Sequence, residues 1–219
     1  TYIVDSGDYI LERINTNIFT KPDELMENIV KVTEFLRKKI ALRGGDPDRE
    51  TLTVVKTVDG HNLYKAADGN VYRVYRFISD VLTVDECPTL HNLYSAARGF
   101  GRFQGMLADF PADELFEIIP DFHNTPKRFE ALKAAIKEDK VNRAATVIPE
   151  IEFALSQEDY LSAVIDSMGD GSVPVRVTHN DTKINNVLFN KETGDAMCVI
   201  DLDTVMPGSA LYDFGDALR

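Results

Sequence analysis

The sequence predicts an α+β fold in which an antiparallel sheet with one helix precedes a mainly helical region. Two observations lead to this prediction. Runs of β-forming residues, separated by turn signals such as Asp59-Gly60, fill much of the first 80 residues. After residue 78, apolar residues recur at helical spacing. We therefore expect an N-terminal lobe at 1–80 and a C-terminal lobe at 81–219.

The expected sheet lobe begins with two strands within 1–14, joined by an Asp-Ser-Gly-Asp turn. Pro22 then opens a helix, because proline suits a first helical turn, and Arg43-Gly44-Gly45 ends it. The apolar residues between them repeat at helical spacing. Three further β segments are expected, at 51–58, 62–67 and 71–78.

The second region contains three expected helices, at 90–108, 126–139 and about 144–168. The first carries Gly99, Gly101 and Gly105, each of which costs a helix roughly 1 kcal/mol relative to alanine. We therefore expect this helix to pack closely on a neighbour. Beyond residue 174 the pattern changes to a strand, a polar loop and a β-hairpin with Thr193-Gly194-Asp195 at its tip.

Composition restricts the class of protein. The chain has 219 residues, of which 44% are hydrophobic and 27% charged, so it has enough apolar residues for a sizeable core. Its formal net charge of -12 argues against nucleic acid or an anionic membrane as the main partner. Cys87 and Cys198 stand in unlike contexts, and Cys198 resembles a core residue, which favours a reducing compartment and a cytoplasmic protein.

Two segments carry the candidate chemistry. The first, His179 to Asn186, has the form H-x-D-x-x-x-x-N. The second is Ile200-Asp201-Leu202-Asp203, which lies across the expected hairpin. Because a hairpin brings its two outer ends together, Asn186 and Asp201 should meet at the same end, with Asp181 on the loop beside them.

Such a set suits phosphoryl transfer from ATP. Asp181 would orient the attacking hydroxyl and accept its proton, while Asn186 and Asp201 would supply hard oxygen ligands to Mg²⁺. His179 is expected to fix the loop through a backbone hydrogen bond. The simpler alternatives are that Asp181 caps a turn and that Asn186 forms an Asx turn. Asp213 and Asp216 in "YDFGD" belong either to the site or to a helix start.

The segments "VTHNDTKINNVLF" and "CVIDLDTVMPGSALYDFGD" resemble the kinase-like phosphotransferase superfamily of aminoglycoside phosphotransferases and choline kinases. The similarity is greatest to bacterial N-acetylhexosamine 1-kinases, which "ERINTNIF", "LMENI" and "IPDFHNTPKRF" also resemble. The resemblance implies a protein-kinase-like two-lobe fold. It also implies phosphorylation of the anomeric hydroxyl of N-acetylglucosamine or N-acetylgalactosamine with ATP and Mg²⁺.

The resemblance also implies roles for particular residues. Asp181 would be the catalytic base, Asn186 and Asp201 the Mg²⁺ ligands, and Asp203 a ligand of a second ion. The phosphate-binding cation is expected on the strand "YILERI", where Arg13 is the only cation, with Glu27 as its ion-pair partner. Further nucleotide contacts are expected from three residues: Phe77 and Ile78 against adenine, and Lys183 either at the γ-phosphate or in solvent.

In "PDFHNTPKR", His123 and Arg128 either help to wall the sugar site or belong to a plain loop and helix cap. Because no glycine-rich phosphate loop is present and "DALR" looks like an interrupted helix, we expect the chain to be part of a longer protein. An aminoglycoside- or choline-type kinase remains the alternative within the class. A glycosyltransferase using Asp201-Leu202-Asp203 as a D-x-D motif, and a kinase-like binding module, are alternatives from other classes.

Overall fold

The computed structural model describes residues 1–4, 7–86 and 89–218. Asp5 and Ser6 of the predicted first turn, and Cys87, lie outside the described residues. The chain divides into two compact units, one formed by Thr1–Ile119 with Val175–Arg219 and the other by Pro120–Pro174. These units differ from the predicted lobes at 1–80 and 81–219, which were defined by the change from strands to helices. The lobe boundary stays a prediction.

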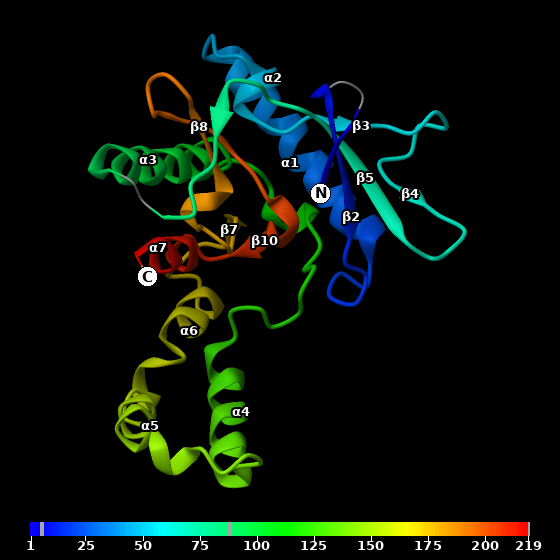
Figure 1. The fold of residues 1–219 in the computed structure, drawn as a ribbon. Helices are drawn as coiled ribbons and strands as arrows, with labels where there is room; N and C mark the ends of the chain where they lie inside the picture. Colours follow the sequence, from blue (N-terminus) through cyan, green and yellow to red (C-terminus); the bar gives the residue numbers. More distant parts are fainter. Residues whose placement is uncertain (5–6, 87–88, 219) are drawn as a thin grey trace. The chain divides into compact units, whose positions relative to one another are not determined.

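The first unit contains an antiparallel sheet, as the sequence predicted (Figure 1). Its strand order is β1-β2-β5-β3, and β4 also pairs with β5. The predicted segments at 51–58 and 62–67 contribute only two residues each to the ladder, because each touches β5 over a short stretch. The strands are β1 (Tyr2–Val4), β2 (Tyr9–Ile14), β3 (Val54–Val55), β4 (Tyr64–Lys65) and β5 (Val71–Arg76).

Helix α1 (Pro22–Leu42) has the predicted bounds and the predicted buried face. Pro22 stands in its first turn with two acidic residues, and Gly44 adopts a positive φ of 78° just after its end. Its apolar side chains belong to the same buried cluster as Val71 and Tyr75 of β5. A single turn of helix, α2 (Pro47–Glu50), leads into β3.

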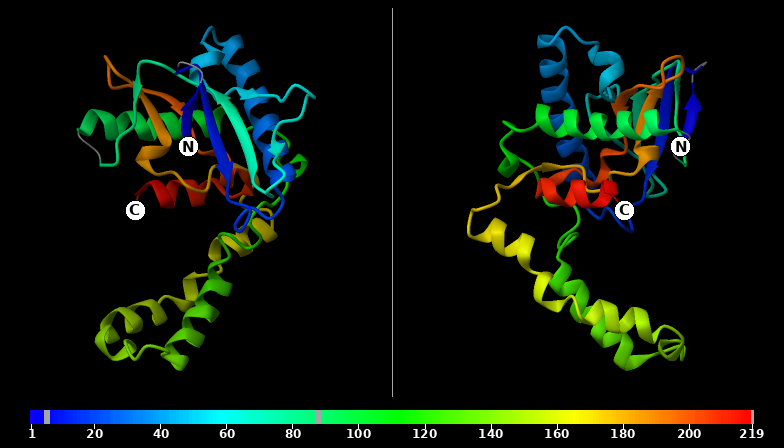
Figure 2. Two further views of the ribbon diagram at one scale, coloured as in Figure 1. Left: turned by 45° about the vertical axis from the view of Figure 1, so that its right-hand side comes forward. Right: turned by 90° about the vertical axis from the view of Figure 1, so that its left-hand side faces the viewer.

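The rest of the first unit contains helix α3 (Leu90–Met106), helix α7 (Ala210–Leu218) and two small antiparallel sheets. Helix α3 lies beside the β8–β9 hairpin in both views of Figure 2. A side chain at Gly99 would come within 3.0 Å of the Ala196 side chain, so close packing is confirmed there, whereas Gly101 and Gly105 face open space. The small sheets are formed by β6 (Val81–Leu82), β8 (Val187–Asn190) and β9 (Ala196–Val199), and by β7 (Arg176–Thr178) and β10 (Met206–Gly208).

The second unit is helical, but the single helix predicted at 144–168 is wrong. Short 3₁₀ turns at Ala144–Thr146 and Glu158–Tyr160 alternate there with α5 (Ile148–Leu155) and α6 (Ala163–Gly169). Pro149 explains the first break, because it lacks a backbone N–H and fits only the start of a helix. The predicted helix at 126–139 is confirmed as α4 (Thr125–Glu138). Across the part of the chain that the structure describes, no helix is both long and apolar enough to cross a bilayer.

Candidate active site

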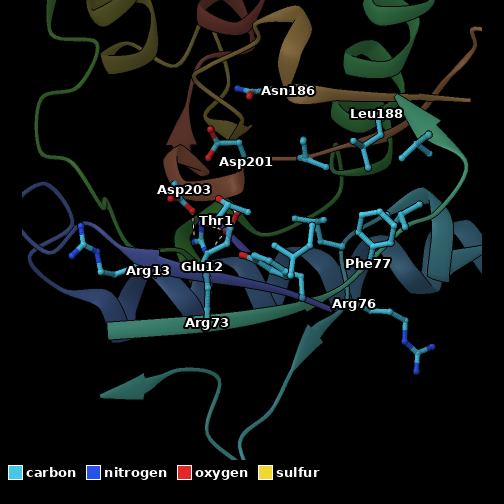
Figure 3. Close-up of a pocket in the computed structure, with 16 residues that line it drawn as sticks. Thr1, Glu12, Arg13, Arg73, Arg76, Phe77, Asn186, Leu188, Asp201 and Asp203 are labelled. Carbon is cyan, nitrogen blue, oxygen red and sulfur yellow. Dashed lines mark hydrogen bonds and ion pairs between the residues drawn. The ribbon is translucent and has the colours of Figure 1, made fainter. Parts of the chain in front are cut away.

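A cavity of about 420 Å³ lies within the first unit, between the inner face of the sheet and the β8–β9 hairpin. Figure 3 shows Glu12, Arg73, Asp201 and Asp203 gathered at one end and Phe77 and Leu188 at the other, where the Arg76 side chain points away from the cavity. The apolar end includes Phe77 and Ile78, the residues predicted to pack against adenine, which follow β5 directly. The charged and amide side chains that line the cavity include Glu12, Arg73, Asn186, Asp201 and Asp203.

The β8–β9 hairpin brings Asn186 and Asp201 to one end, as the sequence predicted. Val187 is paired with Val199, and the amide of Ile200 donates to the Asn186 carbonyl at 2.9 Å. Antiparallel pairing therefore places Asn186 beside Ile200, and Asp201 is the next residue along the chain. Both side chains line the same cavity.

His179 is fully buried and holds the polar loop, in agreement with its predicted role. Its Nε2 lies 2.9 Å from the Ile200 carbonyl, and its Nδ1 lies 3.3 Å from the backbone nitrogen of Asp181. A carbonyl can only accept and an amide can only donate, so the ring carries its proton on Nε2. The rings of Phe100 and Phe103 meet it edge-on, which fixes its plane.

The two predicted segments are also joined through Thr204. Its hydroxyl donates to the His179 carbonyl at 2.7 Å, and Asn180 Nδ2 donates to the Thr204 carbonyl at 2.8 Å. Asn180 itself has a positive φ of 68°, a conformation that asparagine tolerates better than most residues. The loop that carries Asp181 is thus fixed directly to the turn that carries Asp201 and Asp203.

Helix α7 supplies two carboxylates that anchor the same loop. Asp213, which is 4% exposed, accepts from the amides of His179 at 2.9 Å and Asn180 at 2.7 Å. Asp216 accepts from the amide of Thr182 at 2.7 Å. The sequence left these residues open between a site role and a helix start. Asp213 lies in the first turn of α7, Asp216 lies further along the helix, and a site role for them stays a prediction. The sequence did contain a sign that both anchor this loop. Asp213 and Asp216 are three positions apart, and residues at that spacing lie on one face of a helix.

Asp181 stands at the edge of the polar cluster and is about a quarter exposed. Its Oδ2 is 2.8 Å from Lys183 Nζ, and Asn186 Nδ2 donates to its carbonyl at 2.8 Å and to Oδ2 at 3.1 Å. The hydrogen bond from Lys183 to Asp181 raises the pKa of the Lys183 amine. Lys183 is half exposed, so the alternative that it faces solvent and the prediction that it meets the γ-phosphate both remain.

Asp201 begins the turn that follows β9 and has a positive φ of 57°. Although its side chain opens to solvent, the surrounding protein atoms and then the neighbouring Asp203 raise its pKa. Asp203 is 17% exposed at the side chain and forms an ion pair with Arg73. Two carboxylates at one end of a cavity form a local concentration of negative charge, which a cation would relieve.

The amide and carboxylate oxygen atoms that line the cavity are of the kind that bind a magnesium ion. Asn186 uses its Nδ2 atom toward Asp181, so its Oδ1 atom is the end of the amide that could serve as a metal ligand. Carboxylate and amide oxygens are the ligands that Mg²⁺ prefers, and it usually needs only one or two from the protein. Within the described residues no group of three His, Cys, Asp or Glu side chains forms a complete metal cage.

The predicted ion pair between Arg13 and Glu27 is wrong. Arg13 Nη1 donates to Asn70 Oδ1 at 3.4 Å, and Glu27 pairs with Lys31 at 2.9 Å. Successive side chains of a strand point in opposite directions, so Arg13, although it also lines the cavity, does not share the direction of the Glu12 side chain. Figure 3 shows the Arg13 side chain directed away from the charged cluster.

The cation at the centre of that cluster is Arg73, which sequence reasoning missed. It is 7% exposed and pairs with both Glu12 and Asp203. The alternation of "VYRVYR" carried a signal, since Arg73 falls on the same face as the buried Val71 and Tyr75. A buried arginine at an apolar register position indicates a specific ionic partner.

His123 and Arg128, predicted at the sugar site, belong to the second unit. The His123 ring lies edge-on to Phe122, with 4.8 Å between centroids, and Arg128 covers the same Phe122 ring at 5.7 Å. Arg128 also donates to the Phe122 carbonyl. These contacts are local to the start of α4, and the substrate role of both residues stays a prediction.

The chain matches the Phosphotransferase enzyme family over residues 1–219 and belongs to that family. Solved structures share its fold at low sequence identity. An aminoglycoside phosphotransferase from Alicyclobacillus acidocaldarius has a TM-score of 0.60 at 14% identity, covering 98% of this chain and 62% of its own. The amicoumacin kinase hAmiN, solved with AMP-PNP, Ca²⁺ and Ami, has a TM-score of 0.61 at 15% identity, covering 98% and 58%.

A microcompartment-associated aminopropanol kinase is similar as well, with a TM-score of 0.56 at 16% identity over 96% of this chain and 62% of its own. The chain therefore spans about three fifths of the length of these proteins. The fold shared with them is the kinase-like α+β fold that the sequence predicted, with an antiparallel sheet before a helical region.

Proposed function

We propose that this protein is an ATP- and Mg²⁺-dependent kinase of small molecules, and that its acceptor is the anomeric hydroxyl of an N-acetylhexosamine. One observation carries the proposal. A single cavity joins an apolar end, which suits a nucleotide base, to an end with amide and carboxylate oxygens, which suits a metal bound to phosphates. Membership of the Phosphotransferase enzyme family supports the same reaction class.

In this proposal the base lies at the apolar end. Phe77 and Ile78 would contact it from the segment after β5, and Leu188 from β8. The phosphates would then extend toward Asn186 and Asp201. This orientation follows from charge, since bound metal would offset both the phosphates and the carboxylates, whereas the Arg76 side chain beside Phe77 is 56% exposed and lies 4.0 Å from Asp48.

The reaction transfers the terminal phosphoryl group from ATP to a hydroxyl oxygen. The bond from that phosphorus to the ADP oxygen breaks as the bond to the acceptor oxygen forms, and the acceptor proton passes to Asp181. Bound Mg²⁺ would stabilise the charge on the phosphate oxygens. Asn186 and Asp201 would hold that ion, Asp203 is assigned to a second ion, and Lys183 would add positive charge near the transferred group.

The choice of acceptor rests on the resemblance of "VTHNDTKINNVLF" to N-acetylhexosamine 1-kinases. His123 and Arg128 are assigned to the sugar on the same ground. A cationic amino alcohol or aminoglycoside is the competing acceptor class. The fold shared with an aminoglycoside phosphotransferase and an aminopropanol kinase, together with the net charge of -12, favours that alternative.

A substrate panel distinguishes the two classes. Purified protein is incubated with ATP and Mg²⁺ and with N-acetylglucosamine, N-acetylgalactosamine, choline, aminopropanol or kanamycin, and ADP release is followed. Phosphorus NMR then identifies the phosphorylated position. We expect a sugar 1-phosphate, and no product with the Asp181→Asn variant. Turnover of only the cationic acceptors would overturn the sugar assignment, and ATP-independent activity with a nucleotide sugar would favour the glycosyltransferase alternative.

A further inference from the structure

The sheet side of the cavity contains one buried cation between two carboxylates. Arg73 on β5 donates from Nε to Glu12 Oε2 at 3.0 Å, and its Nη2 lies 2.9 Å from the same oxygen. Its Nη1 donates to Asp203 Oδ1. Glu12 is directly opposite Arg73 in the β2–β5 ladder, so the sheet itself fixes this pair.

This arrangement is more than a surface ion pair. The Arg73 side chain is 7% exposed, while those of Glu12 and Asp203 are 23% and 17% exposed and line the cavity. Moving a guanidinium out of water requires good ionic partners, and one carboxylate would suffice to neutralise it. The second carboxylate leaves an excess negative charge in the same cavity as Asp201.

The donors of Arg73 are not exhausted by these partners. A guanidinium has two N–H groups on each terminal nitrogen, and each of Nη1 and Nη2 has one contact here. The planar fork of arginine matches the oxygens of a carboxylate or a phosphate equally well. Asp203 therefore occupies a position at Arg73 that a phosphate oxygen would also satisfy.

We propose that Arg73 is the cation that binds the phosphates of the nucleotide, that Glu12 holds it in place, and that Asp203 is its partner while no nucleotide is bound. This proposal rests on the proposed kinase function and deepens it. The cation that the sequence assigned to β2 is supplied by the adjacent strand β5, and β2 supplies the carboxylate. The register explains the exchange, because Glu12 stands directly opposite Arg73, whereas Arg13 stands opposite Tyr72 and its side chain points away from the charged cluster.

Asp201 and Asp203 have different roles in this proposal. Asp203 forms an ion pair with Arg73, whereas Asp201, on the same turn, is exposed to solvent. A nucleotide that takes the Arg73 donors releases Asp203. Its carboxylate then becomes free for a metal ion, so phosphate binding and completion of the metal site are coupled.

The test is a titration calorimetry series without metal and with Mg²⁺, using adenosine, ADP and ATP. The ratio of the affinities for ADP and adenosine measures how much the phosphates contribute to the free energy of binding. For Arg73→Gln we expect that preference to fall by about 10–100-fold, the scale of lost charge-assisted hydrogen bonds, with adenosine affinity unchanged. Arg73→Lys should retain part of the preference. Lys65→Gln, a matched control for a cation on β4 of the same sheet that pairs with Asp23 and not with the cavity residues, should bind all three ligands as the unmodified protein does.

A second pair of variants keeps the test decisive if Arg73→Gln does not fold. Asp203→Asn releases Arg73 and should raise ADP affinity in EDTA by several-fold. Asp201→Asn removes a charge from the same cavity without touching Arg73, and should raise that affinity less. Equal gains in the two variants, or an unchanged ADP preference in folded Arg73→Gln, would overturn the role of Arg73. If the unmodified protein bound neither adenosine nor ADP, the kinase function itself would fail.

Discussion

Two polar clusters contribute side chains to the cavity, and they are built in opposite ways. The loop cluster is formed by Asp181, Lys183 and the cavity-lining Asn186, which are at most five positions apart in the chain. The sheet cluster is formed by Glu12, Arg73 and Asp203, whose hydrogen-bonded pairs are 61 and 130 positions apart. The loop cluster comes from a single sequence motif. The sheet cluster forms only when three segments distant in the sequence have folded together.

The clusters also differ in burial. Lys183 and Asp181 are 50% and 26% exposed, whereas Arg73 is 7% exposed. Exposed ion pairs contribute little to stability and exchange partners easily, but breaking a buried pair leaves a charge without compensation. Changes in the loop cluster should therefore alter the reaction more than the fold, and changes around the buried groups that support it should alter both.

The largest effect is expected from Asp181→Asn. The variant keeps the size and hydrogen bonding of the side chain but removes the proton acceptor, so kcat should fall by about 10²–10⁴-fold. Nucleotide binding with Mg²⁺ should change little, because Asn186 and Asp201 are assigned to the metal. Steady-state ADP release and nucleotide titration measure the two quantities.

Near-normal turnover in this variant would refute the base assignment. Loss of nucleotide binding with turnover per bound complex intact would instead assign Asp181 to the metal ligands. Thermal unfolding provides the control, since a partly exposed aspartate at the loop edge should affect the melting temperature little.

The next largest effect is expected at the support of the loop. Asp213→Asn retains the shape of a buried anchor but removes the charge that accepts from the amides of His179 and Asn180. Hydrogen bonds to charged groups are worth about 1.5–3 kcal/mol, so the free energy of unfolding should fall by about that amount. Denaturant unfolding measures it, and Asp166→Asn on the second unit is a matched control for a helical aspartate. An unchanged unfolding free energy would show that the loop does not depend on this anchor.

The different origins of the two clusters explain which features could be predicted from the sequence and which could not. The antiparallel sheet, α1 and the meeting of Asn186 with Asp201 follow from local turn signals and from one hairpin, and all are confirmed. The Arg13–Glu27 pair failed because it assumed a strand face and a helix partner that no local pattern determines. Strand order decides that Arg73 stands opposite Glu12, and only the folded sheet establishes that order.

A smaller effect on stability, of opposite sign, is expected at Asp201. Its pKa is raised above the ordinary value of 3.8, so the folded state holds a proton more tightly than the unfolded state. The contribution of Asp201 to the free energy of unfolding is therefore complete below pH 3.8 and is lost as the pH rises through the raised pKa. Asp201→Asn removes that loss and should raise the melting temperature in EDTA at pH 7 by about 1–3 °C, an amount limited by solvent screening.

The gain at Asp201 should shrink as the pH falls through 3.8, because the carboxyl then becomes protonated in the unfolded state as well as in the folded state. A lower melting temperature for Asp201→Asn at pH 7 would mean that the carboxylate stabilises the free protein, contrary to the direction of its pKa. The same variant should lose activity at any practical Mg²⁺ concentration, because Asp201 is assigned to the main metal ion.

The smallest effect on stability is expected at the ion pair between Lys183 and Asp181. Lys183→Met should reduce the free energy of unfolding by about 0.2–1 kcal/mol at pH 7 and low salt, the usual range for an exposed pair. The pKa of Lys183 is raised by Asp181, so this contribution is complete below the ordinary value of 10.5 and is lost as pH rises through the raised value. A double-mutant cycle with Asp181→Asn isolates the pair, and 1 M salt should reduce its coupling, because it screens exposed charges over a few ångströms. A coupling above about 2 kcal/mol would show that the loop cluster is as tightly bound as the sheet cluster, and the contrast between the two would then be wrong.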